Sequence, residues 1–112
     1  NLMILQKIVK DWNVQLDFAC NGEVAVEMIE ANNYDMVLMD LQMPVMDGRM
    51  ATIEVRKFNQ EVPIVALTAS SDVSLKNELM AIGMNDYLTK PFNPNELYHK
   101  LESIINQSLV FV

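Results

Sequence analysis

The sequence predicts a single α/β domain built around a parallel β-sheet. Short apolar segments that are typical of buried strands alternate with segments in which apolar residues recur at helical spacing. The clearest strand covers residues 36–40, where four apolar residues end in a carboxylate and a loop of turn residues follows. The chain has 112 residues, 51% of them hydrophobic, which suffices for one core but not for two.

The chain opens inside an amphipathic helix, because apolar residues recur there at helical spacing: Leu5, Ile8, Val9 and Trp12. Asn13 is a suitable end for this helix. A short strand is then expected over residues 15–19. The Asn21-Gly22 pair turns the chain into a second helix, which covers residues 23–31.

The middle of the chain continues this alternation. Strands are expected at residues 36–40, 64–67 and 86–88, and helices at residues 49–58 and 72–82. The first of these helices follows the turn that ends at Gly48. The second ends at Gly83, since glycine readily adopts the left-handed conformation that caps many helices.

The last helix is expected to begin at residues 93–96. Asn93 reads as the N-cap, Pro94 as the first helical residue and Glu96 as a capping glutamate. The helix should run to about residue 105, with this apolar stripe: Leu97, Leu101, Ile104 and Ile105. After a polar break, the chain closes with four strand-forming residues: Leu109, Val110, Phe111 and Val112.

Composition excludes several classes of function. A net charge of −7 argues against a nucleic-acid surface, which needs clustered lysine and arginine. No apolar run approaches the 18 residues of a membrane span, and no signal peptide is visible, so we expect a cytoplasmic protein without membrane contact. The lone Cys20 excludes an internal disulfide, suits a reducing compartment and is expected to be at least half-buried.

Three predicted strands end in side chains that together suit a phosphoryl group. Asp40 ends one strand with a carboxylate, Thr68 ends the next with a hydroxyl, and Lys90 follows a third with an ammonium group. In open α/β sheets, ligands bind beyond the carboxyl ends of the strands. A carboxylate can attack phosphorus as a nucleophile, and the cation and hydroxyl can then neutralise and bind the phosphoryl oxygens.

Three motifs at these positions resemble one family. They are Met-Asp-Leu-Gln-Met-Pro-Val-Met-Asp-Gly at 39–48, Ala-Leu-Thr-Ala at 66–69 and Tyr-Leu-Thr-Lys-Pro-Phe at 87–92. Residues 1–105 resemble the receiver domains of two-component response regulators, and the loop sequence is most similar to that of receivers of hybrid histidine kinases. The resemblance implies a flavodoxin-like (CheY-like), doubly wound parallel sheet with strand order 2-1-3-4-5.

The resemblance also implies roles for the site residues. Asp40 would be the phosphoacceptor, taking its group from a phosphohistidine on a histidine kinase or a histidine-containing phosphotransfer domain. Lys90 and Thr68 would contact the phosphoryl group, and such a domain catalyses its own phosphorylation and dephosphorylation. Mg²⁺ would bind Asp40 and the backbone carbonyl of Gln42. Tyr87 would act with Thr68 as the switch of a protein-binding face, and Gln42 and Ser70 would tune dephosphorylation.

The chain departs from the family at its start. Receivers begin with an apolar strand and two adjacent acidic residues, whereas Asn1 already lies at the entrance of the first helix. Without that acidic pair, Mg²⁺ binding is expected to be weak or absent. We divide the chain into a receiver over residues 1–105 and a terminal segment over residues 106–112.

The terminal segment resembles the missing strand. We expect residues 109–112 to fill the first-strand position, because an unfilled position would leave backbone groups unpaired. A circular permutation would place this strand within the same molecule. A strand swapped from a second molecule would produce a homodimer. The remaining alternative is a passive remnant of a following segment.

Two other functions stay open. A degenerate receiver would bind partners without being phosphorylated, and the missing acidic pair favours it. An aspartate-nucleophile phosphatase of the haloacid dehalogenase type also uses a strand-end Asp, a Thr and a Lys. Its motif needs a second Asp two residues after the nucleophile, and Gln42 occupies that position here.

Overall fold

The fold is a five-stranded parallel sheet in the order β1-β5-β2-β3-β4. The computed structural model describes residues 10, 15–42, 45–69, 72–90, 95–96, 99 and 108–111. The strands are β1 (Gln15–Phe18), β2 (Met36–Asp40), β3 (Ile64–Thr68), β4 (Asp86–Thr89) and β5 (Ser108–Phe111). Every neighbouring pair is parallel, so the predicted parallel α/β sheet is confirmed.

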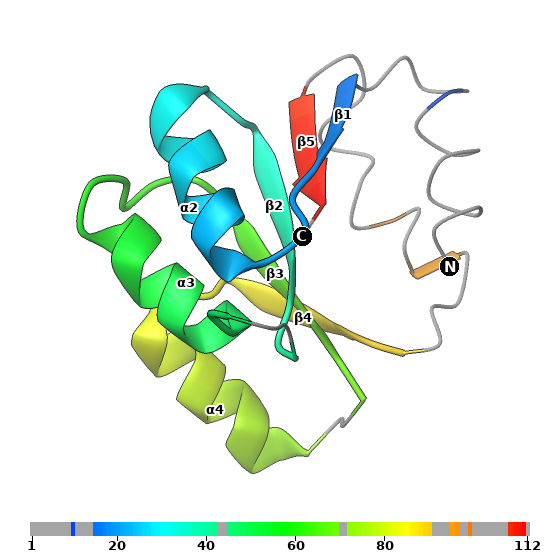
Figure 1. Cartoon of the computed structure of the whole chain (residues 1–112). Helices are drawn as coiled ribbons and strands as arrows, with labels where there is room; N and C mark the ends of the chain where they lie inside the picture. Colours follow the sequence, from blue (N-terminus) through cyan, green and yellow to red (C-terminus); the bar gives the residue numbers. More distant parts are fainter. Residues whose placement is uncertain are drawn as a thin grey trace.

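Three helices of the described part lie on one side of this sheet (Figure 1). They are α2 (Gly22–Ala31), α3 (Gly48–Arg56) and α4 (Val73–Ile82). Each begins with a short polar side chain that accepts a hydrogen bond from a first-turn amide, which satisfies one of the otherwise unpaired donors. These capping residues are Asn21, Asp47 and Asp72. Gly83 ends α4 with a φ of 112°, as the sequence predicts.

The core lies between the central strands and these helices. The first four residues of β2 and all five of β3 are buried. Successive strand residues point to opposite faces, so both faces of these strands are covered. Apolar residues of the helices complete the core: Ala25, Ile29, Ala51, Val55 and Leu79.

The C-terminal strand β5 lies in the middle of the sheet. It pairs with β1 on one side, where Leu16 is opposite Leu109, and with β2 on the other, where Met36 is opposite the same residue. The Val110 side chain is fully buried. In the described part of the chain β1 has no other strand neighbour, so β5 connects it to the sheet. This is the position that the sequence analysis predicts for the closing segment.

Some expectations concern residues that the structure does not describe. The first helix, most of the last helix and Val112 are among them. Within the described part, no helix is long and apolar enough to cross a membrane. The expectation for Cys20 is wrong, because this residue is exposed. It lies in the turn between β1 and the Asn21 cap of α2, where the chain reverses at the surface.

Strand β5 gives a stability prediction. Val110→Asp would place an unpaired carboxylate in the fully buried centre of the sheet, which we expect to cost more than about 4 kcal/mol and to abolish cooperative unfolding. Val73→Asp is the matched control: its side chain is 71% exposed in the first turn of α4, so stability should stay within about 0.5 kcal/mol. Urea unfolding measures both. A Val110→Asp variant as stable as the parent would show that the tail is passive.

Concentration dependence distinguishes the two sources of β5. If β5 belongs to the same molecule, the melting temperature should not change with protein concentration. If a second molecule donates it, unfolding is coupled to dissociation and the melting temperature should rise with concentration. Because the strand joins β1 and β2 within one chain here, we expect no change over a hundredfold dilution followed by circular dichroism. A systematic rise would identify a swapped dimer.

Candidate functional site

Asp40 provides the carboxylate at the carboxyl end of β2. Its Oδ1 accepts a hydrogen bond from the backbone amide of Gln42 at 2.9 Å. Its Oδ2 forms an ion pair with the Lys90 ammonium group. The Asp40 side chain keeps a relative exposure of 25%, and that of Lys90 keeps 36%. The carboxylate is therefore oriented by two partners and still open to a reactant.

The register of the sheet brings Thr68 and Lys90 to the same edge. Thr68 is opposite Thr89 in the pairing of β3 with β4. The backbone amide of Lys90, the next residue, donates to the Thr68 carbonyl at 2.7 Å. Because the strands are parallel, their carboxyl ends coincide there, which is the arrangement that the sequence predicts for Asp40, Thr68 and Lys90.

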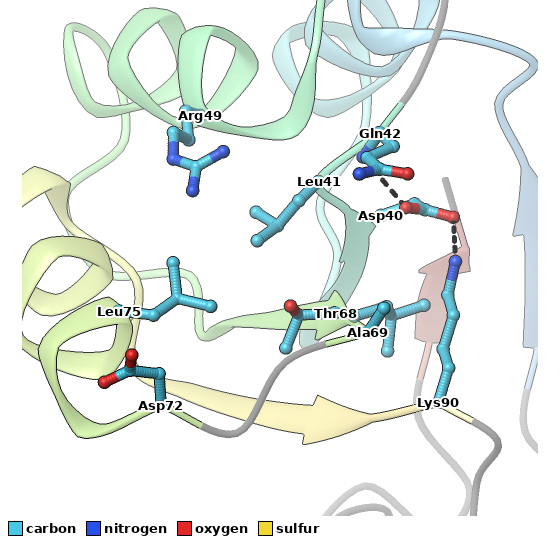
Figure 2. A pocket seen from close by; sticks show the side chains of 10 residues that line it. Asp40, Leu41, Gln42, Arg49, Thr68, Ala69, Asp72, Leu75 and Lys90 are labelled. Atoms are coloured by element: carbon cyan, nitrogen blue, oxygen red, sulfur yellow. Dashed lines mark hydrogen bonds and ion pairs between the residues drawn. The ribbon is translucent and has the colours of Figure 1, made fainter.

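These side chains line one cavity of about 410 Å³ (Figure 2). Gln42 also lines it, so four of the six predicted site residues lie together. Ser70 lies outside the described residues. Tyr87 lines a different pocket, together with Lys76 and His99. Its half-buried ring lies under the Lys76 ammonium group, 5.9 Å from the ring centre.

Two glycines let helices approach the loop that follows Asp40. A Cβ atom on Gly48 would lie 2.3 Å from the Asp40 carbonyl oxygen, so α3 can start there only with glycine. A Cβ on Gly22 would lie 2.2 Å from the carbonyl oxygen of Met46, which instead accepts a hydrogen bond from the Gly22 amide at 3.1 Å. These contacts fix the loop at the mouth of the cavity.

Val45 in this loop has a strained backbone. Its φ is 69°, in the left-handed region that β-branched residues strongly disfavour, and its side chain is 78% exposed. Apolar burial therefore does not explain the strain. The strained residue lies in the loop that follows the candidate carboxylate Asp40, and backbone outliers of this kind concentrate at functional sites.

The cavity has lining residues that sequence reasoning missed, namely Arg49, Asp72 and Leu75. Arg49 directly follows the Gly48 turn, and this was the signal that could have placed it near Asp40. Asp72 stands across the cavity from Asp40 (Figure 2). Backbone and hydroxyl hydrogen bonds from Ser74 lower the pKa of the Asp72 carboxyl, because they favour its charged form.

The donor set for a metal ion is small. Asp40 and Gln42 both line the cavity, and a carboxylate and a backbone carbonyl are oxygen ligands that suit a hard cation such as Mg²⁺. Within the described ranges, no group of three His, Cys, Asp or Glu residues is close enough to form a complete cage. Mg²⁺ is commonly held by one or two carboxylates with water and phosphate oxygens, so this set fits it in part.

Comparison with known proteins identifies the family. Residues 1–102 match the model of the response regulator receiver domain, so the chain belongs to that family. The sensor histidine kinase GacS of Pseudomonas protegens is 39% identical over 102 residues, which are 87% of this chain and 11% of that protein. The histidine kinase BarA of Escherichia coli is 33% identical over 103 residues, which are 90% of this chain and 11% of that protein. The chain spans about a tenth of these hybrid kinases.

Solved structures agree. The receiver domain of a sensor histidine kinase from Pseudomonas aeruginosa, crystallised with a magnesium ion in its active-site cleft, has a TM-score of 0.80 and 36% identity, covering 94% of this chain and 88% of that one. The receiver of Saccharomyces cerevisiae Ssk1, crystallised with the phosphotransfer protein Ypd1, has a TM-score of 0.81 and 32% identity. The match covers 89% of this chain and 79% of that one. The chain thus has the receiver fold of two-component signalling.

The Asp40–Lys90 pair gives the next prediction. Both side chains are partly exposed, so the pair should contribute little to folding, and Lys90→Ala should lower stability by about 1 kcal/mol or less. Lys57→Ala, which breaks the exposed Lys57–Glu54 pair, is the matched control and should behave alike. Urea unfolding checks both. A loss of several kcal/mol with Lys90→Ala alone would make Lys90 a structural cation.

Proposed function

We propose that the chain is a phosphoacceptor that takes a phosphoryl group from a phosphohistidine onto Asp40. One observation carries this proposal: an accessible carboxylate, an ammonium group and a strand-end hydroxyl share one cavity at the carboxyl edge of the sheet. Each supplies something that phosphoryl transfer needs, namely a nucleophile, a counter-charge and a hydrogen-bond donor.

The chemistry follows from these groups. An Asp40 oxygen attacks the phosphorus and forms an acyl phosphate, while the bond from phosphorus to the histidine nitrogen breaks. The departing imidazole keeps that electron pair and takes up a proton. Lys90 leaves the carboxylate and pairs with a phosphoryl oxygen, so its positive charge remains compensated. Attack of water on the same phosphorus later breaks the new bond and restores Asp40.

Mg²⁺ is the cofactor that this proposal includes. Asp40 and the backbone carbonyl of Gln42 would hold it, and its charge would offset the charge that builds up on the phosphoryl oxygens. A relative carries this ion in its active-site cleft. Because the described residues contain no group of three or more His, Cys, Asp or Glu that could hold a metal ion, most ligands of this Mg²⁺ would be water and phosphoryl oxygens, and we expect weak affinity.

The phosphorylated state would be transmitted through Thr68 and Tyr87. Thr68 is 6% exposed and lines the cavity, so its hydroxyl is within the same space as the phosphoryl group. Tyr87 is opposite Ala66 on β3, two residues before Thr68. We propose that movement of Thr68 toward the phosphate lets the Tyr87 ring shift, which changes a protein-binding surface. Gln42 and Ser70 would tune the hydrolysis.

The partner would be a histidine kinase or a histidine-containing phosphotransfer domain in the cytoplasm. The co-crystal of yeast Ypd1 with Ssk1 shows one receiver bound to such a partner. A degenerate receiver that only binds partners is the second candidate, and it is favoured because the described residues contain no group of three or more His, Cys, Asp or Glu that could hold a metal ion. Labelling of Asp40 decides between the two.

Incubation with phosphoramidate and Mg²⁺ tests the proposal. We expect the mass of one phosphoryl group to be added at Asp40. Asp40→Asn should take up none. Asp35→Asn, an exposed aspartate just before β2, is the matched control and should be labelled as the parent is. Intact-protein mass spectrometry measures the added mass, and label that persists in Asp40→Asn would contradict the assignment of Asp40 as the phosphoacceptor.

A further inference from the structure

Arg49 is a second cation at the Asp40 cavity, and the chemistry described so far does not use it. It lies in the first turn of α3, directly after the glycine that contacts the Asp40 backbone. Its side chain is 37% exposed and lines the same cavity as Lys90. In Figure 2 its two terminal nitrogens point into the space between Leu41 and Leu75.

Glu78 of α4 orients this guanidinium group. Its Oε1 accepts from the Arg49 Nε at 2.9 Å. Among the described residues this contact uses the Nε side of the fork and leaves the terminal nitrogens directed at the cavity. An arginine fork matches two oxygens of a phosphoryl group in geometry and charge. A fork held by another side chain loses less freedom when it binds.

The two cations differ in the carboxylates with which they pair. Lys90 is paired with the carboxylate that must attack, so it becomes available to a phosphoryl group only as the reaction starts. Arg49 is paired with a carboxylate on the rim, which is 55% exposed and can be solvated if the arginine turns away. A phosphoryl dianion that enters the cavity therefore meets Arg49 as the cation that Asp40 does not neutralise.

We propose that Arg49 binds the phosphoryl oxygens of the incoming donor before transfer and that Glu78 positions it. This inference rests on the proposed function, in which the donor phosphoryl group moves to Asp40. It adds a substrate-binding residue and assigns the ligand a chemical class, a phosphoryl dianion. Arg49 then acts on donor binding, whereas Lys90 acts on the transfer.

The first experiment measures the initial rate of Asp40 labelling against phosphoramidate concentration with Mg²⁺ present. Loss of a charged two-point contact should raise the half-saturating donor concentration of Arg49→Ala about tenfold or more. Arg49→Lys should recover part of this loss, and Glu78→Gln should show a smaller rise. Lys57→Ala removes an equal charge from the C-cap of α3, outside the cavity, and should leave the value unchanged. An unchanged half-saturation in Arg49→Ala would overturn the inference.

A second experiment separates this inference from the proposed function. In Asp40→Asn, which cannot be phosphorylated, titration with inorganic phosphate should shift the Arg49 Nε resonance in nitrogen-15 spectra. The shift should saturate, and the signal should be missing in Arg49→Ala. Phosphate binding through Arg49 without labelling of Asp40 in the parent would support the anion site and refute the phosphoacceptor. Labelling of Asp40 without any shift of the Arg49 resonance would support the phosphoacceptor and refute the anion site. A loss of stability as the sole effect of Arg49→Ala would also refute the anion site.

Discussion

The parallel register of β2, β3 and β4 is the constraint on which the site depends. It places Asp40 opposite Leu67 and Thr68 opposite Thr89, so that three strands end at one edge. β2 and β3 are buried on both faces and their residues are almost all apolar. A slip by one residue would move Asp40 into the core, where an unpaired carboxylate is costly. Burial of the strands thus fixes the carboxylate at the edge.

Local patterns made much of this fold predictable from the sequence. Buried apolar runs marked β2 and β3, and Gly83 marked the end of α4. Strand-end polar residues then indicated Asp40, Thr68 and Lys90, because parallel topology alone makes them neighbours. The position of β5 also followed, since four strand-forming residues without polar alternation need cover on both faces.

The remaining features depend on packing between distant segments. The Gly48 turn could have placed Arg49 near Asp40, because α3 starts against the Asp40 backbone. The contact with Glu78 of α4 that orients the arginine joins residues 29 positions apart, so no local pattern predicts it. Tyr87 is expected to act together with Thr68, and the register puts the two on the same face of the sheet. Its ring lines a second pocket with Lys76 of α4, a contact between distant segments that no local pattern predicts. Cysteine is a residue type that is often buried, but Cys20 is exposed because it lies in the turn into α2.

Backbone hydrogen bonds hold both ends of the described part of the loop after Asp40. The Gly22 amide binds the Met46 carbonyl, and the Gly48 amide binds that of Leu41. These contacts do not involve the side chains of the loop itself, so Val45 can keep an unfavourable backbone conformation without losing its place. The exposed Val45 side chain can therefore be replaced without loss of these backbone contacts.

The order of the strands has a consequence for how this protein emerges from the ribosome. The β2, β3 and β4 strands are synthesised in succession and can pair as they appear, whereas β1 must wait for residues 108–111. At ordinary synthesis rates this wait is on the order of ten seconds. Among the described strands, β5 is the one that covers this edge of β2, and an uncovered strand edge readily pairs with another chain.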